Sequence, residues 1–438
     1  MGLFALALRF LSWPAAALLA AAALLFNVAV MPRLGRGVYR DAGRKHDPGI
    51  VAYPAVVLAV ILLFRHDPGV AAAIWGMMAL GDPLASVAGK RIGGPALPWN
   101  PGKTWSGSIA YAVFGGAAGS ALLAFVGRVP FGAAFSAFAA FAVLGAFLES
   151  IETGFDDNLT PGLGVAFAYA TLHLGVPGGR RFSLSGIVPV GLSLALAVNA
   201  AIAGLATVLR VVSLSGGIAG ALAGLVVLRF GGWGAYAVLW AFFLLGTVAS
   251  KLGYSRKERL GTAQANRARR GARHVAANVG VGAWLAFAAS RSPAAPILAL
   301  AISGAFAAAL ADTFGTELGT LYGRSPFLIS RGRRVAPGTR GAISPAGLLG
   351  GLLGAALVGA VGAAAGLYNA RFVGIVVLAG ILGSVAESLL IDLSARSGIS
   401  ADHEFCNAFN TLVGAAAAVE IAASIALGAV YLPFGKLV

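Results

Sequence analysis

Two stretches in the first half of the chain combine cations, glycines and hydroxyl groups in a way that suits a nucleoside triphosphate. They are GDPLASVAGKRIG, residues 81–93, and LPWNPGKTWSGS, residues 97–108. Lysine and arginine neutralise phosphate oxygens, glycine lets backbone N–H groups approach them, and a helix N-terminus favours an anion. The candidate phosphate-binding residues here are Lys90, Arg91, Lys103, Ser106 and Ser108. PGKT is not a Walker A motif, because the glycine required five residues before Gly102 is Leu97.

Carboxylates accompany these stretches at the ends of apolar segments. Asp82 ends one segment, and FLESIETGFDDNLTP, residues 147–161, separates two others. An unpaired carboxylate near hydrocarbon costs roughly 2–3 kcal/mol or more and is usually functional, and oxygen ligands of this kind suit magnesium. The candidate metal ligands are Asp82, Glu149, Asp156, Asp157 and Asn158, with Asp82 and Glu149 also as catalytic residues. Arg44 and Lys45, ahead of the second apolar segment, are further phosphate-binding candidates.

The second half repeats this order of parts. Asp312 ends an apolar segment, a basic, glycine-rich loop runs to Ser344, and Glu387 follows after a predicted helical hairpin. The spacing from serine to glutamate is 41 residues in the first half, counted from Ser108, and 43 in the second. We therefore predict an internal repeat with two catalytic sites of related layout.

Acidic and basic residues of the second half supply the second candidate site. The catalytic candidates are Asp312 and Glu387; the phosphate-binding candidates are Arg270, Arg273, Arg334, Arg340 and Ser344; the metal candidates are Asp312, Glu317 and Glu387. Asp312 and Glu317 lie about 140° apart around a regular helix. A shared metal would therefore require the helix to end between them, which Gly315 would allow.

Apolar segments must position these residues. The chain is 58% hydrophobic and only 11% charged, and segments of about 15 to 25 apolar residues, long enough to cross roughly 30 Å of hydrocarbon, recur throughout. We expect an all-α polytopic membrane protein with about fourteen transmembrane helices in two similar helical bundles. The first helix should run from Leu3 to Val30. The predicted domains are residues 1–182 and 183–438.

The distribution of charge favours membrane topology over nucleic-acid binding as the explanation of the net charge of +16. With the predicted helices, 23 of the 32 Lys and Arg residues lie in loops on one face, which the positive-inside rule makes cytoplasmic. In addition, 14 of the 16 acidic residues lie in the same loops or at adjacent helix ends, all except Asp67 and Glu420. Topology explains basic loops but not acids beside them, so metal ions and phosphates at this face are indicated. The single cysteine, Cys406, excludes an internal disulfide.

The segments of the first half resemble phytol kinase and, more distantly, dolichol kinase. The resemblance covers roughly residues 30–180 and rests on Gly81-Asp82, the NPGKTWSGS loop and the Glu-Ser and Asp-Asp-Asn sequences. It implies phosphoryl transfer from CTP to a long-chain prenol. Phytol kinases often have a second aspartate where this chain has Ser86, so Asp82 is the only carboxylate of that motif.

The second half, residues 187–438, resembles phytyl-phosphate kinase. The matching features are Asn199, the FGGWGA turn, the RRGAR sequence, the ADTxxxE motif, the PGTRGAIS loop and the AESLLID segment. The resemblance implies conversion of a prenyl monophosphate to the diphosphate. Cytoplasmic loops of the second half carry 15 Lys and Arg residues against 8 in the first, and a phosphorylated acceptor requires the additional cations.

The sequence thus predicts a bifunctional prenol kinase that uses CTP and Mg²⁺, with prenyl alcohol, prenyl phosphate, nucleotide and lipid bilayer as partners and no nucleic acid. We expect a bacterial plasma membrane, with the active sites facing the cytoplasm; no feature specifies an oligomeric state. Two alternatives remain open: a cytidylyltransferase that makes a CDP-lipid, and a secondary transporter with inverted repeats.

Overall fold

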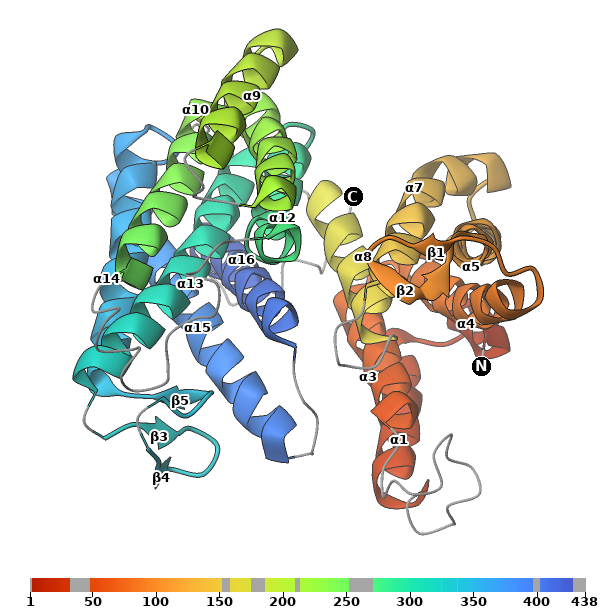
Figure 1. The fold of residues 1–438 in the computed structure, drawn as a ribbon. Helices are drawn as coiled ribbons and strands as arrows, with labels where there is room; N and C mark the ends of the chain where they lie inside the picture. Colours follow the sequence, from red (N-terminus) through yellow and green to blue (C-terminus); the bar gives the residue numbers. More distant parts are fainter. Residues whose placement is uncertain are drawn as a thin grey trace. The chain divides into compact units, whose positions relative to one another are not determined.

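The chain is an all-α polytopic membrane protein, as predicted (Figure 1). A computed structural model describes residues 2–31, 48–151, 158–174, 186–208, 213–251, 271–323, 325–336, 338–396 and 402–427. Within these ranges, eight helices are long and apolar enough to cross a membrane, and four shorter helices are also apolar. The helical segments therefore agree with the predicted architecture.

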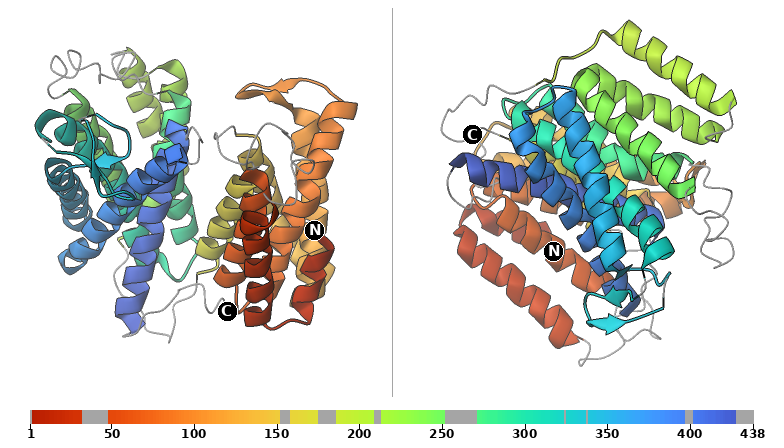
Figure 2. Two further views of the ribbon diagram at one scale, coloured as in Figure 1. Left: turned by 90° about the horizontal axis from the view of Figure 1, so that it is seen from below. Right: turned by 90° about the vertical axis from the view of Figure 1, so that its left-hand side faces the viewer.

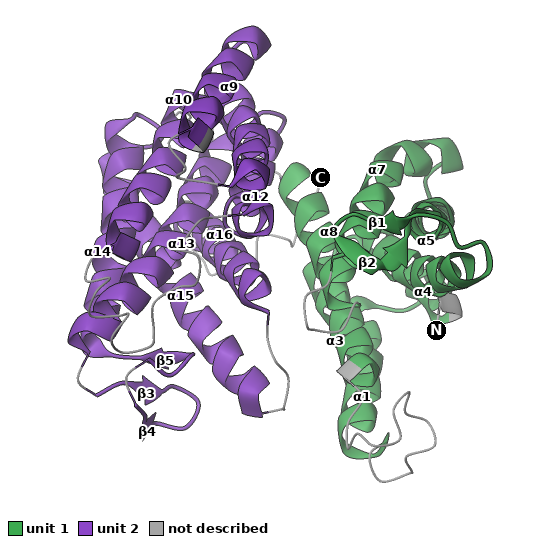
Figure 3. Ribbon diagram, in the orientation of Figure 1, with its two compact units in different colours: residues 1–173, 434–438 green, residues 174–433 purple. Residues whose placement is uncertain are grey.

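The chain divides into two compact units, which Figure 3 shows in different colours. The first comprises the described residues up to His173, and the second comprises Leu174 onwards. The predicted domain boundary, between residues 182 and 183, lies outside the described residues.

The first unit is built around α4. Its elements are η1 (Gly2–Arg9), α1 (Trp13–Ala29), α3 (Pro48–Leu63), α4 (Pro68–Arg91), β1 (Ala96–Leu97), β2 (Asn100–Thr104), α5 (Trp105–Ala110), the π-helix η3 (Tyr111–Gly115), α6 (Gly116–Gly127), α7 (Phe131–Glu149) and α8 (Leu159–Leu172). Helix α4 packs against η1, α3, α5, η3 and α6, while α7 packs against α6 and α8. The predicted first helix is in fact two elements, η1 and α1, because Ser12 and Pro14 form a helix start at residue 13.

The second unit is built around α13, whose first four turns are almost completely buried. Its elements are α9 (Leu192–Val208), α10 (Leu214–Lys251), α12 (Ala272–Ala289), α13 (Ala295–Tyr322), β3 (Phe327–Leu328), β4 (Arg333–Arg334), β5 (Ala342–Ile343), α14 (Pro345–Ala364), η6 (Ala370–Phe372), α15 (Val373–Arg396) and α16 (His403–Leu427). Helices α10, α12, α14, α15 and α16 all pack against α13 (Figure 2).

The long helix α10 is two arms joined at Gly232, which has φ 73° and ψ −173°. A side chain there would strain the backbone and approach the carbonyl oxygen of Val188. This break lies within the predicted FGGWGA turn. The helix is therefore interrupted at this glycine.

Each unit has a small antiparallel sheet between the helix that bears the candidate aspartate and the next helix. In the first unit β1 pairs with β2, with Leu97 opposite Asn100. In the second unit β3 pairs with both β4 and β5. Open sheet edges are not stable in hydrocarbon, so these sheets are expected at the ends of the helical bundles.

Glycines bring the helices that flank each sheet into backbone contact. In the second unit, a Cβ atom added at Gly350 would lie 2.8 Å from the carbonyl oxygen of Phe314, and one at Gly354 would lie 2.9 Å from that of Leu310. In the first unit, a Cβ added at Gly119 would lie 2.9 Å from the carbonyl oxygen of Ala73. Close packing of small residues is a principal attraction between helices in lipid.

We predict that Gly350→Ala destabilises the second unit by roughly 1–3 kcal/mol, because the added methyl group overlaps the backbone of α13. Gly374→Ala is the matched control, since a Cβ there meets no atom within 4 Å. Thermal unfolding of the detergent-solubilised protein measures the melting temperatures of the two variants. Equal melting temperatures for the two variants would contradict the proposed packing.

Candidate functional site

In the first unit, a hydroxyl-capped helix meets α4 close to Asp82. Thr104 caps α5 by accepting a hydrogen bond of 3.2 Å from the backbone N–H of Gly107. A Cβ at Gly107 would lie 3.1 Å from the carbonyl oxygen of Ala85, three residues after Asp82. The start of α5 and the half-buried Asp82 therefore lie at the same end of the bundle.

The second unit repeats this local arrangement. Ser344 caps α14 by accepting a hydrogen bond of 3.1 Å from Gly347. A Cβ at Gly347 would lie 2.8 Å from the carbonyl oxygen of Gly315, three residues after Asp312. The local arrangement is therefore the same in both units. The glycine three residues after the capping residue packs against the backbone three residues after the aspartate.

The sheet of the first unit is held to the C-terminal end of α7. Lys103 forms a short ion pair with the Glu149 carboxylate and donates a hydrogen bond of 2.6 Å to the Glu149 carbonyl oxygen. Trp99 donates through Nε1 to the Ser150 hydroxyl at 2.9 Å, and Asn100 donates to the Ser150 carbonyl oxygen at 3.0 Å. Glu149 and Ser150, predicted as one motif, thus fix the β1–β2 loop.

The predicted phosphate-binding residues of this unit surround the same loop. Lys90 and Arg91 are exposed at the C-terminal end of α4. Ser106 donates to the carbonyl oxygen of Gly93 at 2.5 Å and so ties the end of α4 to the start of α5. The Ser108 hydroxyl is buried without a hydrogen-bond partner among the described residues.

Tyr111 packs between the helical turn before Asp82 and the turn before Glu149. This fully buried side chain lies against Gly81, next to Asp82, and against Gly145, one turn before Glu149. It begins the π-helix η3, a distortion that often occurs at functional sites. The ring therefore lies between the turns that carry these two residues.

The acidic residues of the second unit approach one another without such a ring. Tyr111 stands seven residues after the capping Thr104. The residue seven after the capping Ser344 is Gly351, which has no side chain. Glu387 is 2% exposed, interacts electrostatically with Asp312, and accepts a hydrogen bond from Asn410. Glu387 Oε2 and Asn410 Oδ1 are buried without hydrogen-bond partners among the described residues. These acceptor oxygens could hold a cation.

A second carboxylate of α15, Asp392, holds the sheet of this unit. It is 2% exposed, accepts a short hydrogen bond from Ser330, and lies 3.5 Å from Arg331 Nε. Gly341, with φ 77°, packs against the Ser388 carbonyl oxygen. The C-terminal end of α15 thus holds the β3–β5 sheet in place, as the C-terminal end of α7 holds the β1–β2 loop.

The predicted cations of the second unit differ in their positions. Arg340 is exposed and interacts electrostatically with Glu387, whereas Arg334 is exposed on β4. Arg273 instead forms an ion pair of 3.2 Å with Asp402, the residue that caps α16. Of these predicted cations, Arg340 is therefore the one that interacts with the candidate glutamate.

The condition for a metal shared by Asp312 and Glu317 is not met. Helix α13 continues through Gly315 to Tyr322, because Gly315 packs against α14 instead of ending the helix. The helix end that would let Asp312 and Glu317 share a metal is not formed. The buried Glu317 nevertheless interacts electrostatically with Asp312.

Several predicted site residues lie outside the described residues, namely Arg44, Lys45, Asp156, Asp157 and Arg270. Asn158 is described and stands directly before α8. Within the described part of the chain, no group of three or more His, Cys, Asp or Glu side chains could hold a metal ion. A cation site there must include amide or other oxygens, such as that of Asn410.

Sequence reasoning missed the residues that hold the loops. Asn100 and Trp99 lie within the motif that was singled out for phosphate binding, but only its cations and hydroxyls were considered. Ser330 and its partner Asp392 lie 62 residues apart. No local spacing pattern indicates contacts of this kind.

Comparison with known proteins relates the chain to membrane proteins. Residues 197–403 match the family described as integral membrane protein DUF92. The uncharacterized membrane protein sll0875 of Synechocystis is 31% identical over 47% of this chain and 80% of its own length. Protein VTE6 of Arabidopsis thaliana is 30% identical over 41% of this chain. Probable phytol kinase 2 of Oryza sativa is 32% identical over 32% of this chain.

The chain spans about half the length of the two plant relatives, 55% of VTE6 and 52% of the phytol kinase. No solved structure matches the chain.

The ion pair between Lys103 and Glu149 should stabilise the β1–β2 loop. We predict that Lys103→Met leaves the nearly buried Glu149 unpaired, which costs about 1–3 kcal/mol and accelerates hydrogen exchange in residues 96–104. The double variant Lys103→Met with Glu149→Met removes the unpaired charge and should recover part of the stability. Unchanged exchange in the single variant would show that the pair does not hold the loop.

Proposed function

Because the chain belongs to the DUF92 integral membrane protein family, with a plant relative named as a probable phytol kinase, we propose that it phosphorylates prenyl alcohols within the membrane. In the full proposal, the first unit makes the prenyl monophosphate and the second makes the diphosphate. CTP is the phosphoryl donor, and Mg²⁺ is the cofactor.

The observation that carries this proposal is the repeated arrangement of aspartate, hydroxyl-capped helix and loop-anchoring carboxylate. In each unit an aspartate on a membrane helix lies beside the N-terminus of the next long helical segment, capped by Thr104 or Ser344. Helix N-termini favour phosphate groups, and the loops beside them carry Lys103 and Arg340. Positioning and charge neutralisation are the main requirements of phosphoryl transfer.

The residues of the second unit fit a magnesium ion. Glu387 Oε2 and Asn410 Oδ1 are buried acceptors that lack a donor among the described residues, and Asp312 is close enough to interact with Glu387. Oxygen ligands of these types are the ones that Mg²⁺ prefers. When bound, the ion would neutralise charge on the transferred phosphoryl group. In the first unit, the proposed ligands Asp156 and Asp157 lie outside the described residues.

The proposed reaction of the first unit joins the prenol oxygen to the γ-phosphorus of CTP and breaks the bond to the β-phosphate, which releases CDP. Lys103 would exchange its partner Glu149 for a γ-phosphate oxygen. The freed Glu149 carboxylate could then accept the hydroxyl proton. Capping and loop contacts would hold the nucleotide in line with the acceptor.

The second unit would carry out the same transfer with a monophosphate oxygen as the nucleophile. A phosphate monoester has a second pKa of about 6 and is largely ionised at neutral pH, so no strong base is required. Arg340 is suited to neutralise the additional negative charge of this acceptor. Both sites would face the cytoplasm, and the source membrane would be a bacterial plasma membrane.

We predict that Asp82→Ala abolishes phosphorylation of phytol, whereas Asp312→Ala lets phytyl monophosphate accumulate. The assay gives the purified, membrane-reconstituted protein phytol, Mg²⁺ and γ-labelled CTP and separates the lipid products by charge. The control is Asp67→Asn, which retains the cap on α4, where Asp67 accepts a hydrogen bond from Val70. Both products should persist in this control.

Two other results would change the assignment. The reverse pattern, with monophosphate accumulating in Asp82→Ala and no phytol phosphorylation in Asp312→Ala, would exchange the roles of the two units. Unlabelled lipid with released pyrophosphate would instead identify a cytidylyltransferase that makes a CDP-lipid.

Magnesium should stabilise the wild-type protein against heat. We predict that this shift is lost in Asn410→Leu and Glu387→Gln but retained in Asn199→Leu, which changes a buried asparagine remote from Glu387 in the sequence. Thermal unfolding at increasing Mg²⁺ concentration, with K⁺ at equal ionic strength as the reference, measures the shift. An equal shift in Asn410→Leu would exclude that residue as a ligand.

A further inference from the structure

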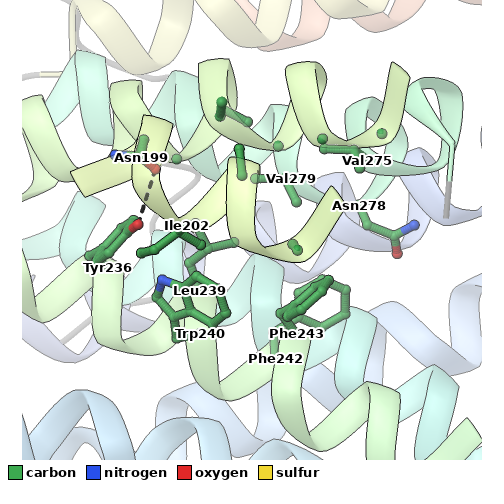
Figure 4. A pocket seen from close by; sticks show the side chains of 18 of the residues that line it. Asn199, Ile202, Tyr236, Leu239, Trp240, Phe242, Phe243, Val275, Asn278 and Val279 are labelled. Carbon is green, nitrogen blue, oxygen red and sulfur yellow. Dashed lines mark hydrogen bonds between the residues drawn. The ribbon is translucent and has the colours of Figure 1, made fainter. Parts of the chain in front are cut away.

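An apolar pocket lies in the second unit between α9, the two arms of α10 and α12 (Figure 4). Its volume is ≈ 100 Å³. Leu239, Trp240 and Phe243 line it from the second arm of α10, and Gly216, Gly217 and Gly220 line it from the first. An apolar space of this order of size can accept a compact hydrocarbon. The pocket contains none of the carboxylates of the candidate site.

One side of the pocket is lined by a buried polar pair. Tyr236 donates a hydrogen bond of 3.0 Å to Asn199 Oδ1, and the Asn199 amide donates to the Ala195 carbonyl oxygen at 2.9 Å. Figure 4 shows this pair on the opposite side of the pocket from Val275 and Asn278. Because these polar groups bond to each other and to the backbone, this side is suited to the terminal part of a hydrocarbon chain.

The other end reaches the first turns of α12, where charged and polar groups gather. His274, half-exposed, lines the pocket there. The neighbouring Arg273 pairs with Asp402 at the start of α16, and the His274 and His403 rings lie 6.4 Å apart. Helix α16 also carries Asn410, which contacts Glu387. The polar end of the pocket thus adjoins the helix that contributes to the acidic site.

We propose that this pocket binds a segment of the isoprenoid chain of the substrate, with the phosphorylated end directed towards the start of α12 and α16. The inference rests on the proposed function, since it assigns the place of the tail in the same reaction. Small residues on one wall and aromatic rings on the other leave room for a methyl-branched chain. The Asn199–Tyr236 pair forms the inner end.

Gly220 offers a way to fill the pocket without disturbing its walls. It lines the pocket, and a Cβ added there meets no atom within 4 Å. Gly220→Leu therefore occupies the space meant for the chain. Gly280→Leu is the matched control, because Gly280 on α12 is exposed, also meets no atom within 4 Å, and does not line the pocket.

The first experiment uses a phytol analogue with a diazirine at the end of its chain, photolysed in the membrane-reconstituted protein and mapped by peptide mass spectrometry. We expect label within residues 199–206, 216–224 and 236–243, competition by phytyl monophosphate, and at least a tenfold loss of label in Gly220→Leu but not in Gly280→Leu. Equal labelling of both variants would overturn the proposal. Competition by dioleoylphosphatidylglycerol as strong as that by phytyl monophosphate would instead assign the pocket to bulk lipid.

The second experiment compares acceptors of different length. In Gly220→Leu, the KM for phytyl monophosphate should rise at least tenfold, whereas the KM for the five-carbon dimethylallyl monophosphate should stay unchanged. An unchanged KM for both acceptors would refute the assignment of this pocket to the isoprenoid chain. Labelling as expected in a wild-type protein that phosphorylates no prenyl substrate would refute the proposed function and leave the pocket assignment in place.

Discussion

Backbone contact between two helices is the constraint on which both candidate sites depend. In the first unit Gly107 lies against the carbonyl oxygen of Ala85, and in the second Gly347 lies against that of Gly315. Lipid provides little hydrophobic drive for helix association, so close van der Waals packing must supply much of the attraction. A side chain at either glycine would push the capped helix away from the helix that carries the aspartate. The aspartate and the phosphate-suited N-terminus would then separate.

The loops between these helices need a second kind of restraint. An irregular segment near a membrane needs partners for its polar groups, which lipid does not supply. In the first unit, the Glu149 and Ser150 groups at the end of α7 provide them, through Lys103, Trp99 and Asn100. In the second unit, Asp392 at the end of α15 has this role. The helix that bears the candidate glutamate is therefore also the anchor of the loop.

The two units use this common arrangement differently. Tyr111 fills the space between the turns that carry Asp82 and Glu149, and Lys103 neutralises the glutamate. At the corresponding place the second unit has Gly351, and Asp312 and Glu387 interact electrostatically, with Asn410 hydrogen-bonded to Glu387. Glu387 Oε2 and Asn410 Oδ1 are buried there without hydrogen-bond partners among the described residues, an arrangement that favours a bound cation. The difference is physically consistent with acceptors of different charge in the two proposed reactions.

The sequence by itself determined the membrane class, most of the helical segments and the order of parts in each half, and it supplied the candidate residues of the two proposed sites. Hydrophobic length, charge at helix ends and glycine-rich loops are local features, so they can be recognised without a structure. The tertiary structure decided which groups pair: Lys103 with Glu149, Ser330 with Asp392, and Asn410 with Glu387. It also decided that α13 continues through Gly315 and that α9, α10 and α12 enclose a pocket. These features depend on contacts between residues far apart in the chain, and the packing of whole helices sets those contacts.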